Sequence, residues 1–200
     1  MIKKFYKITT IVMSLFIHNM SIKSEFKKIA FVGAHSTGKT TIVSKLHNKH
    51  KDSLALYEVF RDTSKVFALN GLTKKDDLKS VYYTFARQLE LELSESVKNK
   101  TLFTDRSIFD CFVYADIIND NILKENVEYQ LLKSFARKYI ATYHKVYIII
   151  PSDKPLTRDN FRDTNKELQM KIHNAFVEEL KMLPNVKIMS IDDIYKEFNL

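Results

Sequence analysis

Residues 33–40 read Gly-Ala-His-Ser-Thr-Gly-Lys-Thr, directly after a short strand-like run, KKIAFV, at 27–32. A helical pattern follows from Thr40 to about His50. The stretch therefore matches G-x-x-x-x-G-K-[ST] between an expected strand and an expected helix, which is the context that this pattern requires. Glycine at both ends permits backbone conformations that a Cβ would block. Successive N–H groups and the helix N-terminus would then favour a bound phosphate.

The side chains of this stretch also have expected roles. Lys39 can reach the β- and γ-phosphates of a nucleotide, and the Thr40 hydroxyl can bind Mg²⁺. The chain holds only 3 glycines in 200 residues, so chance would give such a match in about one chain in a thousand. The alternative is a glycine-containing turn with an exposed lysine. The predicted nucleotide-binding residues are Gly33, Ala34, His35, Ser36, Thr37, Gly38, Lys39, Thr40 and Thr41.

Strand-like and helix-like segments alternate from Lys27 onward. The expected strands cover 27–32, 54–57, 101–104, 145–150 and 186–191. The expected helices cover 40–50, two segments within 60–96 that separate near Gly71, a segment with Phe109 and Ile117, and then 132–143, 168–183 and 192–198. Short apolar strands that alternate with helices indicate a parallel sheet covered on both faces. We therefore expect one α/β domain over residues 20–200.

The overall composition excludes several classes of protein. A hydrophobic fraction of 45% with 12% aromatic residues indicates a packed core. Three glycines and three prolines exclude a collagen, a Gly/Ser linker and a Pro-rich disordered chain. The single cysteine, Cys111, excludes an internal disulfide framework and favours a reducing, cytoplasmic compartment. The formal net charge is +8, but no block of five or six like charges occurs, which disfavours nucleic acid as a partner.

The first 19 residues differ from the rest of the chain. Three lysines, Lys3, Lys4 and Lys7, precede an apolar run at 8–17. The run has the shape of a signal peptide, but no small-x-small cleavage site follows, and its length is too short to span a bilayer. We expect residues 1–19 to be a leader outside the domain or an upstream start before Met20. Export or membrane anchoring through this segment is the alternative.

Acidic and basic side chains follow the expected second and third strands. Because ligands of a parallel α/β sheet bind beyond the carboxyl ends of its strands, these positions are candidate site residues. Asp105 follows Thr-Leu-Phe-Thr, an imperfect form of the apolar run plus Asp that holds Mg²⁺. Arg106 stands where ATPases often have a water-activating glutamate, which argues for transfer to a bound acceptor. The alternative for Asp105 is an N-cap of the next helix.

Glu58 closes the second expected strand, three residues before Arg61. Its carboxylate is a candidate general base for a hydroxyl acceptor. The alternative is a solvated carboxylate that pairs with Arg61. A monophosphate acceptor would not need this base, because its phosphate is already ionised.

The loop after the fourth expected strand carries Arg158 and Arg162. Their spacing of four would place them on one helical face. A segment with this pair can close on a triphosphate, exclude water and neutralise charge on the transferred group. The alternative is an ordinary charged surface loop.

With these residues assembled, the sequence resembles the P-loop kinases, in particular the ATPase-type domains similar to ribosylnicotinamide kinase. It resembles the deoxynucleoside and thymidylate kinases more distantly. The resemblance covers about residues 27–192. It rests on residues 31–41, Glu58 with Arg61, Asp105-Arg106-Ser107 with Asp110 and Tyr114, and Asp159-Asn160-Phe161-Arg162.

This resemblance implies a five-stranded parallel sheet in the order 2-3-1-4-5, with a lid after the fourth strand. It implies ATP and Mg²⁺ as cofactors, with Thr40 and Asp105 at the metal. The implied catalytic residues are Glu58 as base, Arg106 beside the acceptor, and Arg158 and Arg162 in the lid. The expected function is phosphoryl transfer to a nucleoside, a ribosylnicotinamide-like compound or a nucleoside monophosphate. The alternatives are a nucleotide-binding regulatory or interaction protein and a nucleic-acid end kinase.

Overall fold

Five parallel strands form one sheet in the order β2-β3-β1-β4-β5. The computed structural model describes residues 27–60, 63, 78–94, 100–119, 122–153 and 165–200. The strands are β1 (Lys28–Val32), β2 (Leu54–Leu56), β3 (Leu102–Asp105), β4 (Lys145–Ile149) and β5 (Val186–Met189). The parallel sheet predicted from the alternating segments is confirmed, as is the strand order implied by the family resemblance.

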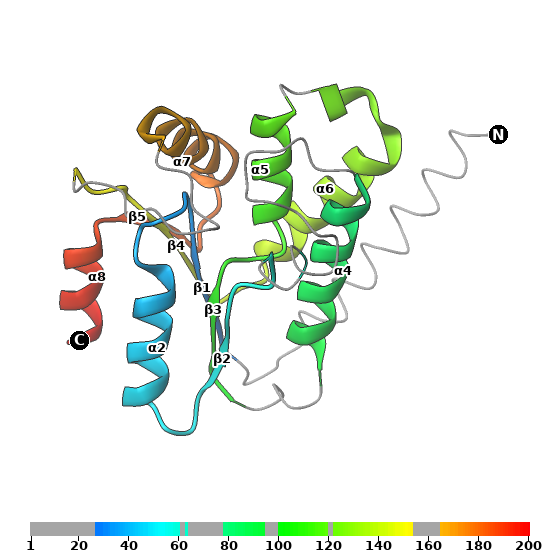
Figure 1. Cartoon of the computed structure of the whole chain (residues 1–200). Helices are drawn as coiled ribbons and strands as arrows, with labels where there is room; N and C mark the ends of the chain where they lie inside the picture. Colours follow the sequence, from blue (N-terminus) through cyan, green and yellow to red (C-terminus); the bar gives the residue numbers. More distant parts are fainter. Residues whose placement is uncertain (1–26, 61–62, 64–77, 95–99, 120–121, 154–164) are drawn as a thin grey trace.

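Helices cover both faces of this sheet (Figure 1). On one face lie α2 (Lys39–Lys49) and α8 (Ile191–Phe198). The other face is covered by α4 (Leu78–Leu93), α5 (Asp110–Ile118), α6 (Val127–Ile140) and α7 (Lys166–Leu180), with the short 3₁₀ helix η2 (Ile122–Glu125) between α5 and α6.

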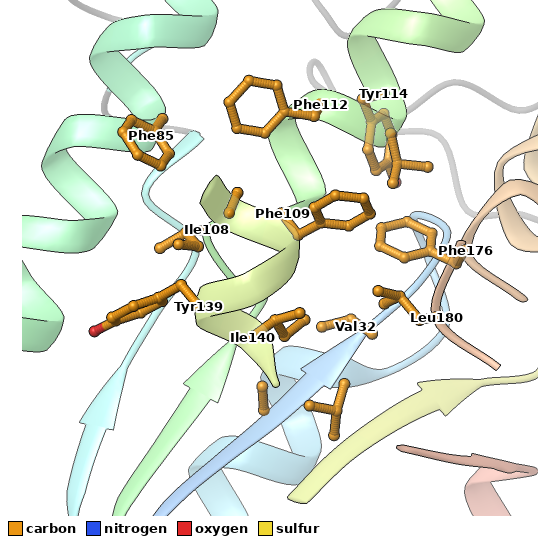
Figure 2. Packing of buried hydrophobic residues seen from close by; sticks show 14 of the residues in the cluster. Val32, Phe85, Ile108, Phe109, Phe112, Tyr114, Tyr139, Ile140, Phe176 and Leu180 are labelled. Atoms are coloured by element: carbon orange, nitrogen blue, oxygen red, sulfur yellow. The ribbon is translucent and has the colours of Figure 1, made fainter. Parts of the chain in front are cut away.

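Alternating residues of the central strands divide the hydrophobic core in two. Ala30 and Val32 of β1 belong to the larger core, whereas Phe31 between them belongs to the smaller core with α2 and α8. Successive side chains of a strand point to opposite faces, so a strand that is apolar at every position must be covered on both. Figure 2 shows the larger core, where the rings of Tyr114 on α5 and Phe176 on α7 lie 6.4 Å apart between centroids.

The boundaries of several elements differ from the sequence predictions by one to five residues. The last strand ends at Met189 rather than 191, because Ser190 caps α8 by accepting a hydrogen bond from the Asp193 N–H. The α6 helix begins at Val127 rather than near 132 and ends at Ile140 rather than 143. Its start is set by Asn126, whose side chain accepts a hydrogen bond from the Tyr129 N–H.

Three of the sequence predictions lie wholly or mostly outside the described residues. They are the leader at 1–19, the first of the two helices expected between 60 and 96 together with Gly71, and the loop that carries Arg158 and Arg162. Among the helices that the structure describes, none combines the length and the apolar character needed to cross a membrane.

A buried ion pair joins the start of β1 to α4. Lys28 Nζ lies 2.8 Å from Glu92 Oε2 and also donates to the Tyr139 hydroxyl at 2.8 Å. Glu92 accepts further hydrogen bonds from the hydroxyl of Tyr143 and from Gln88 Nε2. The Lys28 ammonium lies 4.4 Å and 4.5 Å from the centroids of the Tyr139 and Tyr143 rings. Every partner is buried, so loss of one would leave a charge without compensation.

We expect Glu92→Leu to lower the free energy of unfolding by about 3 kcal/mol, because the Lys28 ammonium would remain buried without its carboxylate. Urea denaturation followed by circular dichroism measures this loss. Glu90→Leu is the matched control, since Glu90 lies on the same helix but pairs with Arg87 at the surface. A loss from Glu92→Leu no larger than that of the control would contradict the assigned role of the pair.

Candidate active site

The loop from Gly33 to Gly38 leaves the carboxyl end of β1 and leads into α2. Gly33 has φ 121°, and a Cβ there would lie 3.3 Å from the carbonyl oxygen of Ile149. Gly38 has φ 85°, and a Cβ there would lie 2.6 Å from Cδ1 of Ile191. Both positions combine a left-handed backbone with close neighbours, so glycine is the residue that fits without strain.

The amino end of α2 has the features of an anion-binding site. Its N-cap residue, Gly38, provides no capping side chain, and the first turn holds no acidic residue. Three other helices do begin with a capping side chain, which comes from Asn126, Asn165 and Ser190. The N–H groups at the start of α2 therefore lack the side-chain acceptor that these helices have, and a phosphate can accept from them.

Lys39 extends back over this loop. Its ammonium donates to the carbonyl oxygens of Gly33 at 3.2 Å and Ala34 at 2.6 Å, and to Oγ1 of Thr37 at 3.2 Å. Burial, and secondly the positive charge of Arg106, lower the pKa of Lys39 to about 8. Neutral acceptors thus hold the cation at the loop, and an anion would stabilise its charged form.

The Thr40 side chain at the start of α2 lies against the Asp105 carboxylate at the end of β3. Thr40 Oγ1 donates to Asp105 Oδ2 at 2.5 Å. Asp105 Oδ1 is buried and makes no hydrogen bond with the described residues, and burial raises the pKa of this carboxyl. The alternative prediction for Asp105 is wrong, because α5 begins at Asp110 with Phe109 as its N-cap residue.

This pair of oxygens fits Mg²⁺. A buried carboxylate oxygen without a partner is costly unless a ligand satisfies it. Within the described part of the chain, no group of three or more His, Cys, Asp and Glu side chains could hold a metal. Two protein oxygens are a fitting set for Mg²⁺, which is usually bound by one or two protein groups together with waters and substrate phosphates.

Arg106 is held in a strained backbone conformation beside this pair. Its φ is 87°, a region that costs a bulky residue of the order of 1–3 kcal/mol. Its N–H donates to the Phe31 carbonyl at 2.9 Å, and Nε donates to Glu58 Oε1 at 2.7 Å. Nη1 lies 3.5 Å from Asp110 Oδ1, and the guanidinium carbon lies 4.9 Å from the centroid of the Tyr114 ring. Despite burial, the charge of Glu58 keeps the pKa of Arg106 well above its usual value.

The two carboxylates that hold Arg106 are themselves mostly buried. Asp110 Oδ2 accepts from the N–H and the hydroxyl of Ser107 at 2.9 Å and 2.7 Å. Burial raises the pKa of Asp110 to about 6, so the carboxyl is mainly ionised at neutral pH. The Glu58 side chain is only 13% exposed, which does not fit the alternative of a solvated carboxylate. Arg61, the partner in that alternative, lies outside the described residues.

A pocket opens beside Arg106, between α4 and α5. It holds about 520 Å³ of space not filled by protein atoms, a volume that includes its open mouth. Its lining residues are Val59, Phe60, Ser80, Val81, Thr84, Gln88, Arg106, Ser107, Asp110, Cys111, Tyr114, Ala115 and Ile118. Burial raises the pKa of the Cys111 thiol, so the thiol stays protonated. Since β1 and β3 are parallel neighbours, the pocket lies at the same edge of the sheet as the loop from Gly33 to Gly38, which is called the phosphate loop below.

A family model described as "AAA domain" matches residues 28–194. The chain belongs to this AAA domain family. No curated protein matches it. Among solved structures, thymidylate kinase from Candida albicans has a TM-score of 0.63 at 16% identity, over 88% of this chain and 90% of that chain. NadR protein in complex with NAD and AMP-PNP has a TM-score of 0.61 at 16% identity over 87% of this chain, and NadR protein in complex with NR has 0.60 at 21% identity over 81%.

At these low identities, the similarity to solved structures shows the fold alone. The chain spans 50% and 43% of the length of the two NadR chains. The predicted resemblance to P-loop kinases is confirmed at the level of family and fold, which is that of a P-loop NTPase. The assigned roles of individual residues remain proposals.

The AAA domain brings together most of the site residues predicted from the sequence. Residues 33–40, Glu58, Asp105 and Arg106 lie at one edge of the sheet, whereas Arg158 and Arg162 lie outside the described residues. Thr41 lies exposed in the first turn of α2.

Sequence reasoning missed two contributors to the site. The first is a polar row on α4, Ser80, Thr84 and Gln88, which lines the pocket. The spacing of four between these polar residues, on a helix with an apolar face, could have indicated that they share one side of the helix. The second is Gln169 on α7, whose Nε2 donates to the His35 carbonyl at 2.8 Å and so ties α7 to the phosphate loop. No sequence signal pointed to that contact.

The pKa of Lys39 predicts how nucleotide affinity depends on pH. A bound triphosphate would favour the charged ammonium and raise its pKa above 8, so binding takes up a proton at higher pH. We therefore expect the affinity for ATP to fall as the pH rises above 8, with a slope approaching about tenfold per pH unit. Equilibrium dialysis with radiolabelled ATP from pH 7 to 9.5 measures this slope.

Two variants serve as controls for this dependence. Lys39→Gln should bind ATP weakly and without that slope, whereas Lys45→Gln, on an exposed turn of the same helix, should keep it. A wild-type affinity that stays constant up to pH 9.5 would show that Lys39 does not pair with the phosphates.

Proposed function

We propose that this AAA domain protein transfers the γ-phosphate of ATP to a small-molecule acceptor. The acceptor classes considered are a nucleoside, a ribosylnicotinamide-like compound and a nucleoside monophosphate. The observation that carries the proposal is the pocket beside Arg106, at the same edge of the sheet as the phosphate loop. Transfer needs a second binding site next to the triphosphate, and proximity of the two reactants supplies much of the rate.

The phosphate loop would hold the donor nucleotide. The N–H groups at the start of α2 and the Lys39 ammonium would bind the β- and γ-phosphates. Thr40 and Asp105 would hold Mg²⁺, which neutralises phosphate charge when bound. In this role the buried Oδ1 of Asp105 gains the partner that the described residues do not supply.

The acceptor side would be organised around Glu58 and Arg106. Glu58 is the candidate base that takes the proton of the attacking hydroxyl. Arg106, fixed by two carboxylates and the Tyr114 ring, would stabilise negative charge that develops on the transferred group. We assign Arg158 and Arg162 to a segment that covers the triphosphate, from the sequence pattern alone.

The direct test measures transfer of the γ-phosphate from radiolabelled ATP to a panel of acceptors. The panel comprises nucleosides, nucleoside 5′-monophosphates and ribosylnicotinamide, with Mg²⁺ present. We expect a labelled product with at least one class of acceptor. Lys39→Ala should reduce its rate by two or more orders of magnitude, of the order expected when a charged group that stabilises the transferred phosphoryl is lost.

The same assay includes the result that would contradict transfer. In that result the wild-type protein binds ATP but labels no acceptor, and it releases labelled phosphate no faster than Lys39→Ala does. The chain would then be a nucleotide-binding regulatory protein. Thermal unfolding with and without ATP establishes that the nucleotide is bound in that experiment.

Glu58→Gln tests the proposed base separately. The amide can still accept the hydrogen bond from Arg106 Nε, so the geometry is preserved while the basic group is lost. With a hydroxyl acceptor, we expect kcat to fall by about 10²–10⁴-fold with little change in the affinity for ATP. Glu90→Gln, an exposed glutamate on α4, is the matched control. Unchanged turnover in Glu58→Gln would remove Glu58 from the role of base.

A further inference from the structure

Gln169 on α7 is a buried amide whose two ends differ in their contacts. The residue is only 1% exposed, and its Nε2 donates to the His35 carbonyl of the phosphate loop at 2.8 Å. Its Oε1 is buried and makes no hydrogen bond with the described residues. A buried acceptor without a partner costs free energy of folding, so stability alone does not explain an amide at this position. What remains to be explained is the contact between Nε2 and the loop.

The start of α7 gives this amide a fixed base. The Gln169 N–H donates to the Asn165 carbonyl at 3.0 Å, and the Asn165 side chain caps the helix. Further along the same helix, Phe176 and Leu180 are buried in the larger core, where the Phe176 ring packs against Tyr114 (Figure 2). The Gln169 side chain therefore reaches the phosphate loop from a helix that the core holds in place.

The contact fixes the direction of the peptide that joins His35 to Ser36. This peptide is trans, and in a trans peptide the carbonyl and the following N–H point in opposite directions. Because the His35 carbonyl points to Gln169 on α7, the Ser36 N–H points away from α7. Among the described residues, no backbone carbonyl accepts from this N–H. Successive N–H groups around a left-handed residue form a concavity that binds anions.

Ser36 is that left-handed residue, with φ 59°. A residue that carries a side chain adopts this region only at a cost in free energy. Rotation of the peptide plane between His35 and Ser36 by about half a turn would return the φ of Ser36 to the ordinary negative region. The same rotation would turn the Ser36 N–H toward α7. The loop thus has a relaxed alternative in which this N–H is misdirected, and the hydrogen bond from Gln169 opposes it.

We propose that Gln169 is a positioning residue for phosphate binding, which directs the Ser36 N–H toward the bound phosphates by holding the His35 carbonyl. The inference rests on one part of the proposed function, the binding of a nucleotide triphosphate at the phosphate loop. Gln169 acts through the backbone and not by contact with the nucleotide. It raises the fraction of molecules whose loop is ready to bind, and the apparent affinity is proportional to that fraction.

Gln169→Met tests this role, because methionine has a similar volume but no donor. Calorimetric titration measures the dissociation constants of AMP-PNP and of inorganic tripolyphosphate, each with Mg²⁺. We expect both to bind about tenfold more weakly, the population ratio that matches the cost of a left-handed backbone. The ratio of the two constants should not change, because the loss lies at the phosphates. Gln169→Leu, which lacks the donor as well, should behave in the same way.

Two controls accompany these variants. Gln130→Met is the matched control, since Gln130 Nε2 donates to the Leu123 carbonyl at 3.4 Å, so the same substitution removes the same kind of bond away from the phosphate loop. It should keep the wild-type affinities. The melting temperature of ligand-free Gln169→Met should stay within about 3 °C of the wild type, because methionine leaves no buried acceptor without a partner.

Ser36→Gly separates the orienting role from a general loss of packing around α7. Glycine adopts a left-handed φ without steric cost, so the relaxed alternative of the loop loses its advantage. With glycine at position 36, Gln169→Met should weaken the binding of AMP-PNP by only about twofold, in place of about tenfold with serine. A packing defect would weaken binding by the same factor in both backgrounds.

Two results would overturn this inference. One is a Gln169→Met protein that binds AMP-PNP and tripolyphosphate as tightly as the wild type does. The other is a loss of the same size with serine and with glycine at position 36. The proposed function fails by a different result, the absence of phosphate transfer to every acceptor, which leaves both binding comparisons valid. A wild-type protein that binds neither probe would reject the two together.

Discussion

The phosphate loop can take its path only because Gly33 has no side chain. A Cβ there would press against the carbonyl of Ile149 at the end of β4, so the loop and the fourth strand share one narrow contact. On the other side of β1, the N–H of Arg106 donates to Phe31 and fixes the end of β3. The central strand thus sets the positions of the loop, the candidate metal ligand and the arginine together. A shift of any one of these strand ends would separate groups that must lie within hydrogen-bond reach.

The strain at Arg106 has a clear compensation. A positive φ at a bulky residue costs free energy, and such residues persist where their surroundings hold them. Here two carboxylates and an aromatic ring hold the guanidinium, and a backbone hydrogen bond holds the peptide. The result is a cation whose direction is fixed before any ligand arrives, which lowers the cost of reorganisation during a reaction.

The sequence predicted the loop and the parallel sheet because both depend on local patterns. The two glycines of the motif need left-handed backbone, and short apolar runs need cover on both faces. Strand order came from the family resemblance, since local patterns do not specify which strands are neighbours. The ion pair between Glu58 and Arg106 could not be predicted from the sequence. The two residues lie 48 positions apart, and their contact depends on the positive φ of Arg106, which composition does not reveal. The start of α6 was missed because its Asn126 cap lies before the apolar pattern begins.

The buried pair of Lys28 and Glu92 also bears on the pocket. Buried ion pairs often stabilise a fold less than apolar side chains of the same volume would, so stability alone does not explain one. Glu92 accepts from Gln88 Nε2 one turn earlier on α4, and Gln88 lines the pocket. Because an ionised carboxylate can only accept, this contact fixes which side of the amide carries the oxygen. The Lys28–Glu92 pair lies at the opposite end of β1 from the pocket, yet through Glu92 it orients the Gln88 amide in the pocket wall. Removing the pair would leave this amide free to turn.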